Sequence, residues 1–276
     1  MRIAVTGGTG RVGRAIVEMA LADGHEVVSI DQTPPTKNTQ QPKLTFIQAD
    51  LTDYQAFLQA IGGSDALIHM AAIPAPGHHP DHQVHNNNVV TSYNALRAAV
   101  EVGITRVCQA SSVNATGLAY SRWPHFDYFP LDEQHPTYNE DPYSLSKWIC
   151  EEQGYSFARR YEKMVIASLR FHGVVPKRSD MVQALHHGHT DAMTKNLWAY
   201  TLSEAASRSC LLSLTADFTG HEVFYIVAPD TITNTASLEL KEKFYPDVPV
   251  RGDLSGNKSF FDSSKAERML GWKHDK

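Results

Sequence analysis

Thr6-Gly7-Gly8-Thr9-Gly10-Arg11-Val12-Gly13 follows the apolar run 3–5 and leads into an amphipathic pattern that ends near Gly24. A glycine-rich turn between a strand and a helix is the context in which proteins bind dinucleotide phosphates. Glycine allows left-handed backbone angles and a close approach of the backbone to a pyrophosphate. The free N–H groups and the dipole at the helix N-terminus then favour the anion. A glycine-rich turn can also be only a tight turn between a strand and a helix. Other parts of the sequence are needed to distinguish this from a dinucleotide site.

Short apolar runs alternate with helical patterns beyond this turn. Strands are predicted at 3–6, 26–30, 44–48, 66–70, 106–110 and 165–170, and helices at 12–21, 53–61, 89–102 and 143–162. This alternation is typical of an α/β fold with a doubly wound parallel sheet. After residue 176 the pattern predicts a helix at 197–212, a strand at 222–227, and helices near 236–244 and 263–270. We expect a core at residues 1–175 and a small substrate-binding lobe at 176–276, packed together as one domain.

The composition excludes several classes of function. The chain has 276 residues, 42% apolar and 20% charged, with a net charge of -5, which gives no reason to expect nucleic acid or an anionic membrane as a partner. It contains no apolar run long enough to span a membrane. The N-terminus shows no signal-peptide pattern and the three cysteines lie far apart. We therefore expect a cytoplasmic protein.

Two acidic residues follow predicted strands. Asp31 ends the second strand, eighteen residues after Gly13, where a carboxylate accepts hydrogen bonds from the adenosine ribose and repels a 2′-phosphate. This position favours NAD over NADP, although Asp31 also fits a solvated loop acid. Asp50, before Leu51, fits either a contact with the adenine edge or a turn acid ahead of the next helix.

Tyr143 and Lys147 lie four residues apart in a predicted helix, and so on one face of it. An ammonium group beside a phenol lowers the pKa of the phenol and makes it a proton acceptor near neutral pH. Together with the glycine-rich turn, this pair indicates hydride chemistry on a bound nicotinamide.

The chain resembles the extended short-chain dehydrogenase/reductases of the NAD-dependent epimerase/dehydratase group, whose fold is a Rossmann-type sheet. The resemblance covers almost the whole chain. It rests on the glycine spacing at 6–13, Asp50-Leu51, His69-Met70-Ala71-Ala72, Asn88-Val89 with Ser92 and Asn94, Ser111-Ser112, Tyr143-x-x-x-Lys147, Leu169-Arg170-Phe171-His172-Gly173, and the segment Asp262–Trp272.

The resemblance implies roles for individual residues. Ser112, Tyr143 and Lys147 would be catalytic: Ser112 would hold the reacting oxygen, Tyr143 would act as base or acid, and Lys147 would bind the ribose. NAD would be bound by Gly7, Thr9, Gly10, Arg11, Val12, Gly13, Asp31, Asp50, Leu51, Ala71, Ala72, Asn88, Tyr143, Lys147 and Phe171. The substrate would be bound by Ser111, Ser112, Ile73 and His172. It also implies a homodimer formed through the helices at 89–102 and 143–162, and it requires no metal.

The sequence departs from the group in two respects. His172 stands where many members carry Asn, and only about a hundred residues follow Pro176. In size the chain resembles compact members of the group such as the uronate and aldose dehydrogenases. This resemblance implies an NAD-dependent dehydrogenase of a small free sugar, sugar acid or related polyol. An epimerase or dehydratase that retains its NAD is the alternative, and a sensor without turnover is a third reading, which the intact Ser112, Tyr143 and Lys147 disfavour.

Other candidate substrate contacts stay open. The aromatic loop at 113–141, with Trp123 and Tyr128, fits either a sugar-stacking surface or a self-packed loop. A carboxylate substrate would pair with an arginine, and the candidates are Arg170, Arg178, Arg208 and Arg251. Histidines cluster at His78, His79, His82 and His85, and again at His186, His187 and His189, without the carboxylates or cysteines that usually complete a metal site.

Overall fold

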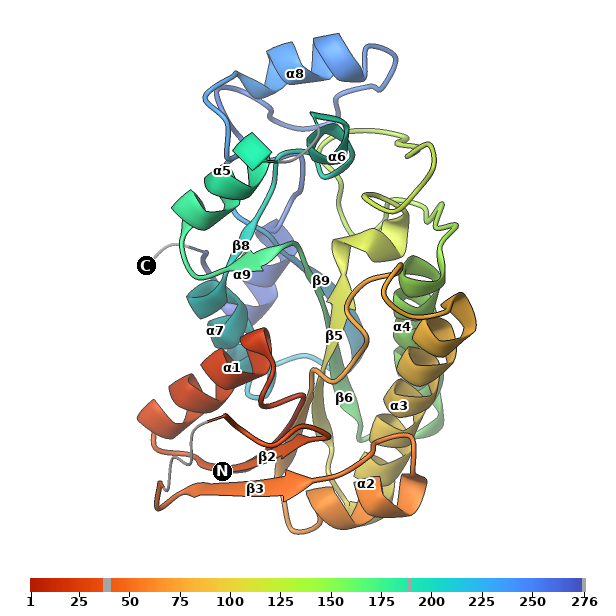
Figure 1. Ribbon diagram of the computed structural model, residues 1–276, viewed down its shortest axis with the longest axis vertical. Coiled ribbons are helices and arrows are strands. Elements are labelled where there is room, and N and C mark those ends of the chain that lie inside the picture. Colours follow the sequence, from red (N-terminus) through yellow and green to blue (C-terminus); the bar gives the residue numbers. More distant parts are fainter. Residues whose placement is uncertain (37–40, 188–189, 275–276) are drawn as a thin grey trace.

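A seven-stranded parallel sheet forms the centre of the computed structural model (Figure 1), which describes residues 1–36, 41–187 and 190–274, and only the backbone at 184–187 and 190–191. The strand order is β3-β2-β1-β4-β5-β6-β9. The strands are β1 (Arg2–Thr6), β2 (Glu26–Asp31), β3 (Leu44–Gln48), β4 (Ala66–His69), β5 (Arg106–Ser112), β6 (Val165–Phe171) and β9 (Gly220–Ile226). Because the strand order reverses between β1 and β4, the carboxyl ends of these two strands flank the crevice in which such sheets bind ligands. The predicted doubly wound α/β fold is confirmed.

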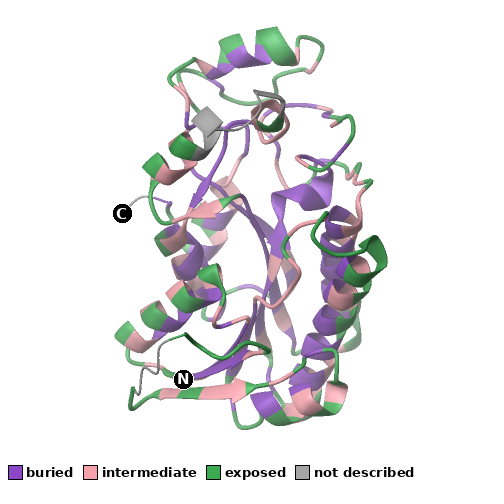
Figure 2. Ribbon diagram, viewed as in Figure 1, coloured by how far each residue is buried: buried purple, intermediate pink, exposed green. Residues whose placement is uncertain are grey.

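Helices cover both faces of the sheet. One face packs on α1 (Arg11–Ala22), α7 (Ser203–Ser213) and α9 (Ser264–Leu270), and the other on α2 (Tyr54–Ile61), α3 (Asp81–Val102) and α4 (Pro142–Arg160). Each interface is a separate apolar cluster, and the strands of the central sheet other than the edge strand β3 are buried over most of their length, as Figure 2 shows in purple. Strands that are buried on both faces read as near-continuous apolar runs, which is why the sequence pattern located them well.

The helix α3 begins eight residues earlier than predicted. It starts at Asp81 after Pro80, and its first turns run through the polar segment 81–88, in which Val84 and Asn88 are nonetheless buried. The apolar period that marked the helix begins only at Val89. The pattern missed this part because Val84 is its only buried apolar residue, while the buried Asn88 makes hydrogen bonds instead of apolar contacts.

The C-terminal hundred residues serve two purposes. The segment with α7 and β9 completes the central sheet and one of its helix layers. The remainder lies over the carboxyl end of the sheet, at the top of Figure 1. It contains β7 (Val174–Val175), β8 (Thr201–Leu202), α5 (Arg178–His187), α6 (Thr190–Lys195) and α8 (Ser237–Phe244). In the part of the chain that the structure describes, no helix combines the length and the apolar composition that a membrane span requires.

The helix predicted at 197–212 starts only at Ser203. Leu197 and Trp198 have positive φ angles, 53° and 52°, so the backbone bends there and is not helical between α6 and α7. Both side chains are buried in the cluster that fills the covering lobe. The apolar period at this point therefore reflects packing of a bent segment and not a helix face.

Candidate active site

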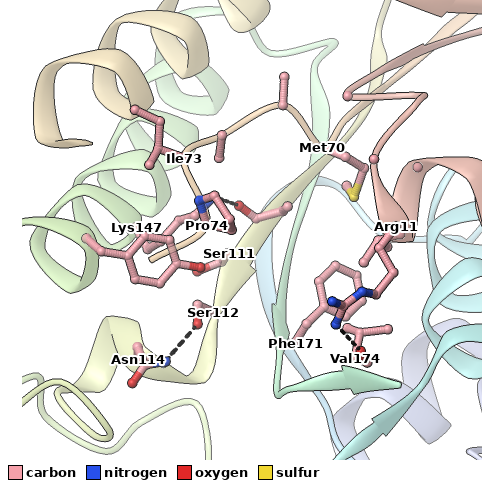
Figure 3. Close-up of a pocket in the computed structure, with 18 of the residues that line it drawn as sticks. Arg11, Met70, Ile73, Pro74, Ser111, Ser112, Asn114, Lys147, Phe171 and Val174 are labelled. Atoms are coloured by element: carbon pink, nitrogen blue, oxygen red, sulfur yellow. Dashed lines mark hydrogen bonds between the residues drawn. The ribbon is translucent and has the colours of Figure 1, made fainter. Parts of the chain in front are cut away.

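One cavity of about 950 Å³ opens at the carboxyl ends of the strands, between the glycine-rich turn and α4. Figure 3 shows its two sides, with Arg11 and Phe171 across from Lys147 and Ser112. The structure brings nearly all the residues predicted for the site into its wall: Gly7, Thr9, Gly10, Arg11, Val12, Gly13, Asp31, Leu51, Ala71, Ala72, Ile73, Ser111, Ser112, Tyr143, Lys147, Phe171 and His172. Asp50 and Asn88 are the two that do not line it.

The glycine-rich turn leaves room for a ligand at the start of α1. Gly7 has a φ of 67°, and a Cβ atom on it would lie 2.8 Å from the backbone nitrogen of Ala71. A Cβ atom on Gly13 would lie 2.0 Å from the Gly7 carbonyl oxygen. No side chain caps the N-terminus of α1, which begins at Arg11 after the N-cap Gly10, and these first residues line the cavity with their free N–H groups. These features fit the pyrophosphate of a dinucleotide.

Asp31 ends β2 at the edge of this turn. Its carboxylate accepts hydrogen bonds from the backbone nitrogens of Thr9, at 3.2 Å, and Thr33, at 3.1 Å. A carboxylate has about four acceptor positions, so it retains capacity for ribose hydroxyls. Asp50 differs, because its carboxylate bonds the backbone and the hydroxyl of Thr52, which lowers the pKa of Asp50. It acts as a turn acid, and its neighbour Leu51 reaches the cavity instead.

Tyr143, Lys147 and Ser112 meet at the ends of α4 and β5. The side chain of Asp141 caps α4 by accepting from the backbone nitrogens of Tyr143 and Ser144, which fixes the first turn. Lys147 Nζ donates to the Ala110 carbonyl at 2.8 Å and lies 5.8 Å from the centre of the Tyr143 ring. The Ser112 hydroxyl is hydrogen-bonded to the Tyr143 phenol. The three groups expected to perform the chemistry therefore share one wall of the cavity.

The pKa of Tyr143 differs from the expectation that Lys147 lowers it. Burial raises the pKa of this phenol above its usual value, and the hydrogen bond from Ser112 offsets only part of that rise. Burial likewise lowers the pKa of the Lys147 ammonium, which bonds a carbonyl and not the phenol. Spacing on a helix brought the two side chains together, but the effect of burial on both groups depends on the tertiary fold.

A buried ion pair supports the same part of β5. Glu151, one turn after Lys147, pairs with Arg170 through two hydrogen bonds of 2.8 Å. The Ser111 hydroxyl donates to the same carboxylate, and Arg170 also donates to the Tyr225 hydroxyl at 3.2 Å. Ser111 and Arg170 are neighbours in the register of β5 and β6. The network thus holds the strand end that carries Ser112.

Asn88 supports the cavity wall from behind. Its side-chain oxygen accepts from the Ile73 backbone nitrogen at 2.8 Å, and its amide donates to the Ile73 carbonyl and to Ser146 Oγ, both at 3.1 Å. The Ser146 hydroxyl donates to the Tyr143 carbonyl at 2.7 Å. Asn88 therefore ties the segment after β4 to the first turn of α4 and does not itself touch the cavity.

His172 faces the cavity with both ring nitrogens already bonded. Nδ1 accepts from the Gly173 backbone nitrogen at 2.7 Å, and Nε2 donates to the Asn196 carbonyl at 3.0 Å. Burial lowers the pKa of His172 to about 4, so the ring is neutral at pH 7. Both ring nitrogens of His172 are therefore used in hydrogen bonds to the backbone of Gly173 and Asn196. Asn196 itself lines the cavity.

The other candidates for substrate contact lie outside the cavity wall. Trp123 is 79% exposed. The Arg251 guanidinium stacks on the ring of Tyr128, and the Tyr128 hydroxyl donates a hydrogen bond to Asp132. Each of the other candidate arginines has partners in the protein. Arg170 forms an ion pair with Glu151, and Arg178 forms one with Asp230. Arg208 donates hydrogen bonds to the backbone carbonyls of Lys273 and His274. Among described side chains no His/Cys/Asp/Glu group suited to a metal occurs; the side chains of His186 and His187, and all of His189, lie outside the described residues.

Several cavity residues were not predicted from the sequence. They are Gln32, Thr33, Met70, Pro74, Asn87, Thr91, Ala110, Asn114, Ala119, Tyr120, Gly173, Val174 and Asn196. Six of the thirteen adjoin a predicted residue in the sequence, so adjacency alone would have found these six: Gln32, Met70, Pro74, Asn87, Ala110 and Gly173. Tyr120 belongs to the aromatic loop at 113–141, which was a candidate for substrate contact, so the sequence did contain a signal for it. Its ring packs against that of Tyr143 at a centroid distance of 5.8 Å. Asn196 had no such signal, because it reaches the cavity only through the fold of the covering lobe.

Comparison with known proteins places the chain among proteins of related chemistry. The model of the NAD dependent epimerase/dehydratase family matches residues 3–199. A putative UDP-glucose 4-epimerase from Methanocaldococcus jannaschii is 31% identical over 183 residues, which are 64% of this chain and 57% of the relative. An L-arabinose 1-dehydrogenase (NAD(P)(+)) from Haloferax volcanii is 37% identical over 111 residues, 40% of this chain and 41% of the relative. The chain thus spans about half the length of these relatives.

A solved structure extends the likeness to the whole fold. The UDP-glucose 4-epimerase of Thermotoga maritima, with UDP-glucose, aligns with a TM-score of 0.73 over 100% of this chain and 94% of its own. The two are 20% identical, so this likeness concerns the fold alone.

Proposed function

The chain belongs to the NAD-dependent epimerase/dehydratase family, and we propose that it is an oxidoreductase that moves a hydride between nicotinamide and a hydroxyl or carbonyl carbon of a small sugar, sugar acid or related polyol. The observation that carries the proposal is the meeting of Ser112, Tyr143 and Lys147 in the same cavity as the glycine-rich turn. The arabinose dehydrogenase relative, whose name specifies net oxidation of a free sugar, supports this reading.

The residues of this chain divide the work of the reaction. When bound, NAD supplies the positively charged nicotinamide ring that takes up or returns a hydride. Tyr143 takes the proton from the substrate hydroxyl, and the Ser112 hydroxyl holds the substrate oxygen in place. Lys147, whose ammonium lies in the same cavity, binds the ribose of the nicotinamide half of the cofactor. Asp31, Gly7, Gly13 and the start of α1 hold the dinucleotide.

Net formation of NADH tests this proposal. Purified protein is incubated with NAD and a panel of free aldoses, polyols and uronic acids while absorbance at the NADH band is followed. We expect steady NADH production with at least one compound. If no compound yields NADH while bound cofactor is reduced and reoxidised in place, the dehydrogenase proposal fails.

The second candidate is an epimerase that retains its NAD, and the epimerase relative favours it. The same three side chains serve both reactions, because an epimerase takes the hydride from the substrate and returns it to the opposite face. UDP-glucose would then be converted without net NADH, with cofactor that survives gel filtration. Product analysis by NMR distinguishes the two cases.

We further propose a homodimer formed by α3 and α4. These helices lie side by side in Figure 1, and they expose Val90 (41%), Tyr93 (46%) and Tyr155 (37%). A self-complementary patch of this kind suits a two-fold interface. Light scattering after gel filtration should give twice the chain mass, and Tyr93→Glu should give the monomer. A monomeric wild type would refute this proposal.

A further inference from the structure

The chain bends sharply where the covering lobe meets the cavity. Leu197 and Trp198 follow Asn196 directly, and both have left-handed backbone angles although neither is glycine. Such backbone angles are strained in residues with a side chain, and strain of this kind collects at functional sites. Leu197 is fully buried and Trp198 is 7% exposed, so core packing holds the bend in place.

Asn196 is held at this bend by contacts on two sides. Its backbone carbonyl accepts from Nε2 of the buried His172 at 3.0 Å, and its side-chain amide donates to the Ala192 carbonyl at 2.7 Å. The side-chain oxygen receives no hydrogen bond from any residue that the structure describes. The side-chain amide is thus oriented by one hydrogen bond, and because Asn196 lines the cavity, its side-chain oxygen is available as an acceptor there.

We propose that Asn196 is the residue of the covering lobe that recognises the substrate, by accepting a hydrogen bond from a substrate hydroxyl, and that His172 is a positioning residue that acts through it. The inference rests on the proposed function, since it assigns a specificity role within the same site. It places recognition on a hydroxyl donor, which a sugar or polyol supplies at several carbons.

The first test is Asn196→Ala, assayed with the free aldose or polyol that wild-type protein oxidises best. Loss of one hydrogen bond between neutral groups should raise KM about 10-fold, while kcat changes less than about 3-fold. Affinity for NAD should stay within about 2-fold, which shows that the variant is folded. Asn86→Ala, on an exposed position of α3, is the matched control and should leave both constants unchanged.

Monodeoxy analogues of the same compound identify the hydroxyl. One analogue should be about 10-fold worse for wild type but equal to its parent for Asn196→Ala, because the partner is already missing. Equal sensitivity of wild type and variant to every analogue would overturn the assignment of Asn196 to a hydroxyl.

His172→Phe tests the positioning role, since it keeps a ring of similar size and removes both hydrogen bonds. This variant should raise KM about as much as Asn196→Ala, and the double variant should be no worse than either alone. Effects that multiply would show that His172 acts independently of Asn196. Wild-type protein that yields no NADH refutes the proposed function, whereas NADH formation with an unchanged KM in Asn196→Ala refutes this inference alone.

Discussion

The end of the sheet and the lobe that covers it are built in different ways. At the sheet, buried polar contacts fix each reacting group: Asp141 caps α4, Lys147 bonds Ala110, and Glu151 pairs with Arg170. In the lobe, aromatic contacts dominate, such as Trp198 on Phe260 at 5.7 Å. The proposed catalytic groups are therefore held by polar contacts at the end of the sheet, whereas apolar packing holds the lobe that covers them.

Removing the phenol should have the largest effect. Tyr143→Phe deletes the proton acceptor, and general acid–base catalysis of this kind contributes about 10²–10⁴-fold to rate. We expect kcat to fall by at least about 10²-fold while the affinity for NAD, measured by titration, is nearly unchanged. Tyr93→Phe, on the exposed face of α3, is the matched control and should keep the full rate. A Tyr143→Phe variant that keeps the wild-type rate would refute the assignment of Tyr143 as the proton acceptor.

Breaking one ion pair in each region sharpens the contrast in stability. Glu151→Gln leaves the Arg170 guanidinium buried without its counter-charge, which should cost about 3–5 kcal/mol of unfolding free energy. In the lobe, Asp253→Asn removes the exposed partner of Lys258 and should leave the denaturation midpoint unchanged. Urea denaturation measures the unfolding free energy of both variants. Equal losses of unfolding free energy would contradict the proposed difference between the sheet and the lobe.

Acid should destabilise the sheet through its buried histidines. Burial lowers the pKa of His69 and His221 to about 3 and that of His172 to about 4. Unfolded histidine titrates near 6.5, so between that pH and the folded pKa the unfolded chain binds more protons, and stability falls as pH falls. From pH 7 to 5 each of the three should contribute a loss of about 2 kcal/mol.

The variant His221→Gln isolates one of these contributions. It should reduce the fall in unfolding free energy between pH 7 and 5, measured by urea denaturation at each pH. His82→Gln, on an exposed position, is the control and should leave the fall intact. A pH dependence that is the same in both variants would show that His221 is not among its causes.

The choice of cofactor should show the smallest effect. Asp31→Ala removes the carboxylate at the end of β2, which should weaken NAD about 10-fold and NADP less, because the lost acceptor served the ribose and the lost charge repelled a phosphate. Binding titrations with both cofactors measure the shift. Asp23→Ala, at the exposed C-terminus of α1, should leave the preference unaltered.

The same contrast explains what the sequence could predict. The glycine-rich turn, the alternation of strands with helices and the pair Tyr143 and Lys147 are local patterns. The parallel sheet and, through the family resemblance, most of the cavity wall could therefore be predicted. Asp50 was ambiguous because a turn acid and a ligand acid follow a strand in the same way. The pKa of Tyr143 and the place of Asn196 were out of reach, because burial and the bend at Leu197 arise only when distant segments pack together.

The row of residues along α4 has a consequence for how such a protein changes over evolution. Tyr143, Lys147 and Glu151 lie at four-residue intervals on one face, so a single helix carries both the proposed catalytic pair and one partner of a deeply buried ion pair. A substitution there is penalised twice, in rate and in folding. The covering lobe has its own apolar core and none of the three proposed catalytic side chains, so its cavity-facing residues can change without altering the proposed reaction.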